Sequence, residues 1–92
     1  MTIYEERDYE SQMANGYKFL NEAENLYSEG KLNGAIKKYY NASLAFEIAK
    51  EIAIKCVDVN LQVKARDIEF YCNEKIDELE KFKKVNLNEN VR

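Results

Sequence analysis

The sequence contains no proline and only three glycines, Gly16, Gly30 and Gly34, in 92 residues. A β-rich chain of this length needs more turn residues than these. Hydrophobic residues at 46% and charged residues at 34% are typical of a folded globular domain and not of a disordered chain. The sequence therefore predicts one all-α domain, an antiparallel three-helix bundle, because so short a chain has room for a single core.

The first helix is predicted to begin at Thr2, where the hydroxyl of Thr2 and the carboxylate of Glu5 form a capping box, or at Asp8. Apolar residues then recur at helical spacing. The predicted core-facing stripe comprises Met13, Tyr17, Leu20, Ala23 and Tyr27, widened by Phe19 and Leu26. Gly16 interrupts this stripe at a cost of about 1 kcal/mol relative to alanine, which we interpret as close approach of a neighbouring helix.

The segment 28–34 predicts the first turn. Gly30 can adopt the left-handed conformation that ends a helix, and Asn33 can cap the next one. The second helix, about 35–56, is apolar over more than half its circumference, which favours a central position with neighbours on two sides. Its two stripes are Ala35, Tyr39, Ala42, Phe46, Ala49 and Ile52, and Ile36, Tyr40, Leu44 and Ile48. Tyr39 and Tyr40 are interpreted as core and core-rim residues rather than as a recognition surface.

A second turn is predicted at 57–60, where β-branched residues meet Asp58 and Asn60. The alternative is one unbroken helix over 35–84, which would need a partner chain and a sustained heptad pattern. The third helix is predicted over 61–84, with a domain over 1–85 and a polar tail at 86–92. Its core-facing stripe comprises Leu61, Ala65, Ile68, Cys72, Ile76, Leu79 and Phe82.

Charge is unevenly distributed along the chain. Residues 1–30 hold seven acids against two cations, a net charge of −5, whereas residues 31–57 have a net charge of +3. This difference favours antiparallel packing of the two segments, although exposed pairs contribute only tenths of a kcal/mol each. Nucleic-acid binders concentrate cations on one face with a net positive charge, so nucleic acid is not an expected partner.

The sequence offers little to catalyse a reaction. It has no histidine, which removes the commonest general base and zinc ligand. Cys56 and Cys72 lie too far apart along a helical hairpin for a disulfide and are interpreted as small buried hydrophobes. No phosphate-binding loop is present. We therefore expect no catalytic residue, metal or cofactor. The chain has no apolar run of membrane-spanning length, and its N-terminus is acidic where that of a signal peptide would be basic. Together these features predict a cytoplasmic protein without direct membrane insertion.

The segment 23–44, AENLYSEGKLNGAIKKYYNASL, resembles the first helical hairpin of the microtubule-interacting and trafficking (MIT) domain family. In that family an alanine seven residues before a turn glycine is followed by an Ala-x-x-x-Tyr-x-x-Ala run. The matching residues here are Ala23, Gly30, Ala35, Tyr39 and Ala42. Tetratricopeptide hairpins share this small-large-small pattern, but a lone repeat of that kind cannot bury its face by itself.

The resemblance is good over residues 14–60 and loose over 61–84. Glu69, Phe70 and Tyr71 fit the Glu-Tyr-Leu-x-Arg-Ala-Glu stretch of the family, whereas Asn73 and Lys75 stand where it has an arginine and a ligand-receiving acid. The resemblance implies a non-enzymatic domain that binds helical tails of ESCRT-III-like filament proteins. It also implies either a domain of a larger ATPase, protease or kinase, or a stand-alone adaptor.

We hypothesise that a partner helix lies in a groove between the second and third helices as a fourth member of the bundle. The candidate peptide-binding residues are Leu44 and Ile48 on the second helix and Lys64, Ile68, Glu69, Tyr71 and Glu78 on the third. The alternative is a structural module: a homodimer formed through surplus apolar surface, or a tetratricopeptide-like or HEPN-like scaffold without a peptide groove.

Overall fold

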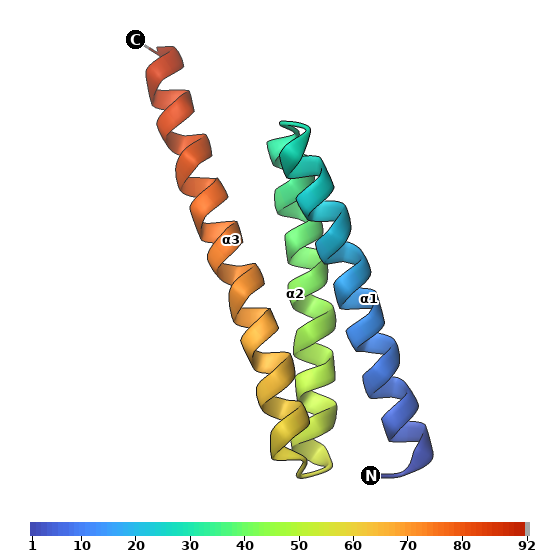
Figure 1. The fold of residues 1–92 in the computed structure, drawn as a ribbon. Coiled ribbons are helices and arrows are strands. Elements are labelled where there is room, and N and C mark those ends of the chain that lie inside the picture. Colours follow the sequence, from blue (N-terminus) through green and yellow to red (C-terminus); the bar gives the residue numbers. More distant parts are fainter. Residues whose placement is uncertain (92) are drawn as a thin grey trace.

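The computed structural model describes the backbone of residues 1–91 and the side chains of residues 1–85. It consists of three helices, α1 (Ile3–Ser28), α2 (Leu32–Lys55) and α3 (Val59–Val91), with no strand over the described backbone. In Figure 1 the three helices lie side by side, and each runs antiparallel to the helix before it in the sequence. The middle helix is α2, and both α1 and α3 pack on it. The all-α class is confirmed. The alternative of one helix over 35–84 is wrong, because α2 ends at Lys55.

The ends of the helices follow the sequence in most places. Thr2 Oγ1 accepts a hydrogen bond from the Glu5 amide at 3.2 Å, and the Thr2 amide donates to Glu5 Oε1 at 3.0 Å, so the capping box is confirmed. Gly30 adopts a left-handed conformation with φ 79°. The prediction for Asn33 is wrong: α2 already begins at Leu32, and Lys31 occupies the N-cap without a side-chain hydrogen bond.

The second turn lies where the sequence predicted it, between Lys55 and Val59. Asp58 caps α3, since its Oδ1 accepts a hydrogen bond from the Leu61 amide at 3.1 Å. The third helix is longer than the predicted 61–84. Its backbone continues through the predicted polar tail to Val91, while the side chains of 86–92 lie outside the described residues.

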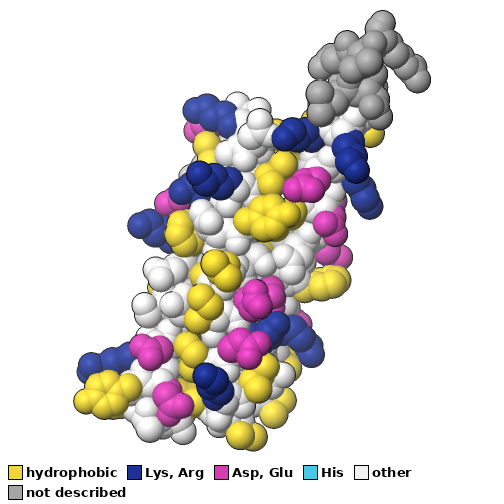
Figure 2. Space-filling view, turned by 180° about the vertical axis from the view of Figure 1, so that it is seen from behind, with side chains coloured by type: hydrophobic (Ala, Val, Ile, Leu, Met, Phe, Trp, Pro, Cys, Tyr) yellow, Lys and Arg dark blue, Asp and Glu magenta, His cyan; other side chains and the backbone are white. Residues whose placement is uncertain are grey.

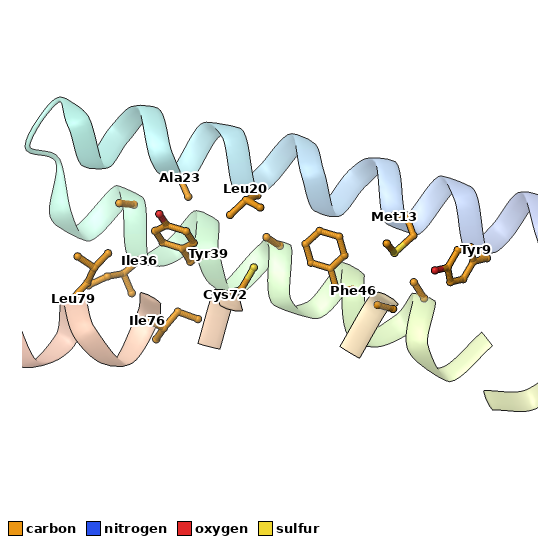
Figure 3. Close-up of a cluster of buried hydrophobic side chains, with 14 of the residues drawn as sticks. Tyr9, Met13, Leu20, Ala23, Ile36, Tyr39, Phe46, Cys72, Ile76 and Leu79 are labelled. Carbon is orange, nitrogen blue, oxygen red and sulfur yellow. The ribbon is translucent and has the colours of Figure 1, made fainter. Parts of the chain in front are cut away.

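The core lies along α2, with contributions from all three helices (Figure 3). Its buried hydrophobic residues are Tyr9, Met13, Leu20, Ala23, Ala35, Ile36, Tyr39, Ala42, Phe46, Ala49, Ala53, Ala65, Cys72, Ile76 and Leu79. Six of these are alanines with no exposed surface, which allows the helices to approach closely. The predicted central position of the second helix, with a neighbour on each side, is therefore confirmed. Its second apolar stripe is not covered as a whole, since Ile36 is buried but Tyr40, Leu44 and Ile48 are exposed.

The buried stripes of the outer helices are narrower than predicted. Tyr17, Tyr27 and Phe82 were assigned to core-facing stripes, yet all three are exposed. The reason is that α1 and α3 each pack chiefly against α2, so only the residues aimed at α2 are fully covered. The ring of Tyr17 still meets the ring of Phe46 edge-on, with ring centroids 5.2 Å apart, at the rim of the core.

Candidate interaction site

The seven predicted peptide-binding residues do not lie in one groove. Leu44 and Ile48 line a hollow of about 280 Å³ beside Phe19 of α1, and no residue of α3 lines it. These two residues therefore lie on the flank of α2 opposite α3. The second-helix part of the predicted groove is not where the sequence analysis placed it, because apolar spacing shows that residues share one side of a helix but not which neighbouring helix that side meets.

Most of the predicted residues on α3 face α1 instead of α2. Lys64 lines a hollow of about 330 Å³ with Tyr9 and Tyr17. Glu78 lines a small hollow of about 30 Å³ with Tyr27 of α1 and Tyr39 of α2. Ile68 and Tyr71 lie between them at spacings of four and three residues, which places them on the same helix face.

We call this surface the α1/α3 groove. Its α1 wall comprises Glu6, Tyr9, Glu10, Met13, Tyr17 and Tyr27, its α3 wall comprises Leu61, Lys64, Ile68, Tyr71, Lys75, Glu78 and Leu79, and Tyr39 of α2 lies at its floor. At one end the groove is narrowed by the Tyr9 hydroxyl, which donates a hydrogen bond to the Leu61 carbonyl at 3.0 Å.

Glu69, the remaining predicted residue, lies on the opposite flank of α3. Its carboxylate pairs with Lys50 Nζ of α2 at 2.8 Å, and both side chains are largely buried. This hydrogen bond is the main reason that the pKa of Lys50 is raised. Glu69 is thus already engaged within the protein and is not available for a ligand.

Two further polar contacts join α2 and α3, which line a hollow of about 560 Å³ at the end near Tyr40 and Glu80. Ser43 Oγ donates to Asn73 Oδ1 at 2.7 Å, and the Tyr40 hydroxyl donates to Glu80 Oε1 at 3.5 Å. Together with Lys50 and Glu69, they join α2 and α3 at three levels along the axis. A partner helix entering here would have to break these contacts, so the α1/α3 groove is the better candidate.

The α1/α3 groove has an apolar, largely aromatic lining with charged residues along its walls. Burial, followed by the charge of Glu24, raises the pKa of Tyr39 to about 12, and burial also raises the pKa of Tyr9. Both hydroxyls therefore remain neutral at physiological pH. On the α3 wall Lys75 Nζ lies 5.8 Å from the centre of the Tyr71 ring and 3.5 Å from Glu78 Oε2.

Sequence reasoning missed the contribution of α1 to this groove. Glu6, Glu10 and Tyr17 recur at intervals of four and seven residues and so share a helix face. That spacing was available in the sequence. It was not used because the apolar stripe of the first helix was assigned entirely to the core.

The groups able to perform chemistry are few in the described part of the chain. No cluster of three potential metal-ligating side chains occurs among the described residues. Both cysteines are free, and the pKa of each thiol is raised, that of Cys72 to about 11 mainly by burial and that of Cys56 mainly by its hydrogen bond to Glu5. Protonated thiols are weak nucleophiles.

No family model, curated protein or solved structure matches this chain. Over the described residues, none of the three helices has a stretch that is both long and apolar enough to cross a bilayer.

Proposed function

We propose that this protein is a non-enzymatic, cytoplasmic protein-interaction domain that docks an amphipathic helix of a partner in the α1/α3 groove. The observation that carries the proposal is the pair of hollows between α1 and α3, lined by Tyr9, Tyr17 and Tyr27 of α1 and by Tyr39 of α2. A helix placed there would become the fourth member of the bundle, a common mode of peptide recognition.

The dimensions of the groove suit a short helix. On α3 the lining runs from Lys64 to Glu78, which at 1.5 Å per residue corresponds to about 21 Å, or four helical turns. Exposed Tyr17 and Tyr71, together with half-buried Ile68, supply apolar contact surface along that length. Tyrosines are well suited to this role, since they bring a large rigid ring and a hydroxyl.

The charges on the walls favour a basic partner. Glu6 and Glu10 line the α1 wall, and residues 1–30 as a whole carry a net charge of −5. The α3 wall carries Lys64 and a Lys75–Glu78 pair, so the acidic charge of the groove lies on the α1 side. The expected ligand is therefore a helix with one apolar stripe and lysines or arginines on the side that faces α1.

The resemblance to MIT domains adds a candidate source for such a helix, the carboxy-terminal tails of ESCRT-III-like filament proteins. Its matching alanines, Ala23, Ala35 and Ala42, have no exposed surface. The packing reason for small residues in this hairpin therefore holds, as it would in a tetratricopeptide hairpin. The resemblance therefore supports the geometry of the α1/α2 hairpin. The ligand that we propose is chosen from the lining and charges of the α1/α3 groove.

Titration of ¹⁵N-labelled protein with basic amphipathic tail peptides tests the proposal. We expect backbone shifts at 6–17 and 64–78. Tyr71→Ala should weaken binding by about tenfold or more, since central aromatic residues dominate such interfaces. Phe70→Ala is the matched control, because Phe70 is exposed on another face of α3. Shifts confined to the α2/α3 boundary, or equal effects of the two variants, would refute the groove assignment.

A further inference from the structure

The face of α2 opposite the buried core is apolar and exposed. Its two edges meet the neighbouring helices, since Leu44 and Ile48 line a hollow with α1 and Tyr40 donates a hydrogen bond to Glu80 of α3. Tyr40, Leu44 and Ile48 follow each other at intervals of four residues, with 53%, 56% and 40% of their surfaces exposed. We call these three residues and the flanking Lys37 and Glu51 the α2 outer face. Figure 2 shows hydrophobic side chains in a row along the middle of the molecule on the side seen from behind.

The residue pattern of this face is symmetric about Leu44. Tyr40 and Ile48, both apolar, lie four residues before and after it. Lys37 and Glu51, of opposite charge, lie seven residues before and after it. All five positions share one side of the helix. Such a pattern is complementary to itself when two copies of the helix cross in opposite directions with Leu44 on the two-fold axis.

We propose that this face binds a second copy of the same chain, forming a homodimer with antiparallel α2 helices. Leu44 would contact Leu44 of the partner copy, Tyr40 would pack on Ile48 of the partner copy, and Lys37 would pair with Glu51 of the partner copy. The reverse contacts occur on the other side of the axis, so one surface supplies both halves of the interface.

The charges around the face support this occupant. No ion pair within the described residues involves Lys37 or Glu51. Lys83 and Lys84 of α3 join Lys37 around a hollow of about 560 Å³ at the end of the face near Tyr40. The antiparallel arrangement brings the partner's carboxylates to this basic end, whereas a parallel one would place lysines against lysines.

This inference is independent of the proposed peptide site. The α1/α3 groove lies on the other side of α2, so a dimer formed through the α2 outer face leaves both grooves accessible. The assembly would then present two peptide sites to a polymeric partner. The α2 outer face also provides a defined surface for the homodimer that the sequence analysis gave as an alternative.

Charge reversal in the full chain tests the register of the dimer. In sedimentation velocity over a range of concentrations we expect the wild type to associate reversibly. Lys37→Glu and Glu51→Lys should each weaken association by about tenfold or more, because like charges then meet on both sides of the axis. The double variant K37E/E51K should restore it. Lys18→Glu is the control, since Lys18 is an exposed lysine of α1 outside this face. A wild type that remains monomeric, or a double variant that is not restored, overturns the proposal.

Disulfide trapping tests the orientation. In a Cys56→Ser background, Leu44→Cys should cross-link two chains on oxidation, because position 44 faces itself across the axis. Lys55→Cys should not, since its two copies would lie about 33 Å apart along the helices. Cross-linking at both positions would indicate a parallel pair, and cross-linking at neither would exclude the interface. Leu44→Asp should abolish association while leaving peptide binding intact, which separates this proposal from the peptide site.

Discussion

At the residue scale, Gly16 shows how closely α1 and α2 approach. A Cβ atom added at this position would lie 2.5 Å from Cε1 of Phe46, a residue of α2 with no exposed surface. The sequence interpretation of Gly16 as a point of close approach is therefore confirmed. The glycine lowers the helix propensity of α1, and in return the ring of Phe46 fits against its backbone.

We expect Gly16→Ala to destabilise the fold by about 1–2 kcal/mol. The gain of about 1 kcal/mol in helix propensity is outweighed by overpacking against a buried ring that cannot move away. Urea unfolding followed by circular dichroism measures the change. Gly34→Ala is the control: the atoms nearest to its Cβ all belong to the flexible side chain of Leu26, with Cδ1 at 3.3 Å. A stabilised Gly16→Ala variant would contradict this account.

Glu5 connects two distant parts of the chain. The Cys56 thiol donates a hydrogen bond to Glu5 Oε2 at 3.0 Å, and the backbone and hydroxyl of Thr2 donate to the same carboxylate. These contacts lower the pKa of Glu5 from 4.5 to about 2. Since the folded-state pKa lies below the unfolded value, the contacts stabilise the fold above pH 4.5, and that contribution is lost as the pH falls towards 2.

We expect Cys56→Ala to raise the pKa of Glu5, because the thiol is the largest of these causes. The value should stay below 4.5, since the Thr2 cap remains. Carboxyl ¹³C chemical shifts followed through an acid titration measure the pKa directly, with Ser28→Ala at the far end of α1 as the unchanged control. An unaltered Glu5 titration in the Cys56 variant would show that the sulfur contact is absent in solution.

At the element scale, the two turns have the same geometry with different residues. In the first turn the amide of Lys31 donates to the Leu26 carbonyl and that of Gly30 to the Tyr27 carbonyl, the Schellman pattern. In the second, Asp58 and Val57 make the equivalent bonds to Ala53 and Ile54. Gly30 and Val57 both have positive φ, 79° and 55° respectively. Only glycine adopts that conformation without a steric cost.

We expect Val57→Gly to stabilise the protein by about 1 kcal/mol, because a β-branched side chain in the left-handed region is strained and Val57 is too exposed to contribute packing. For a domain of this size, this corresponds to a rise in Tm of about 4–8 °C. Gly30→Val is the converse variant and should destabilise by a similar amount. A lower Tm for Val57→Gly would mean that the second turn differs from the structure.

At the scale of the whole molecule, α2 is the central helix on which both α1 and α3 pack. The chain measures 58 × 19 × 13 Å, and both outer helices depend on α2 for their burial. Three partly or fully exposed surfaces result: the α1/α3 groove, the polar α2/α3 boundary and the α2 outer face. Because α2 separates the α1/α3 groove from the α2 outer face, the proposed peptide site and the proposed self-association surface can be occupied independently.

Cys72 reports on the unfolding of the entire bundle. It is fully buried against α2, and burial raises the pKa of its thiol to about 11. We expect alkylation of Cys72 to require global opening, while the half-buried Cys56 at the end of α2 reacts through local fraying. Mass spectrometry of alkylated peptides at increasing urea concentration separates the two rates. Equal rates in the absence of urea would show that the centre of the core opens locally.

The sequence by itself determined the three helices, the approximate places of both turns and the central place of α2, because these depend on local propensity and on the period of apolar residues. It left the start of α1 open between Thr2 and Asp8, and the structure places the cap at Thr2. It could not determine which flank of α2 each residue faces. Leu44 and Ile48 fit either flank by spacing, and Glu69 resembled a free acid until Lys50 was placed beside it. Only the tertiary structure decided these points, because the angle at which α1 and α3 pack on α2 fixes which flank is covered. For the same reason the candidate groove lies between α1 and α3 and not between α2 and α3.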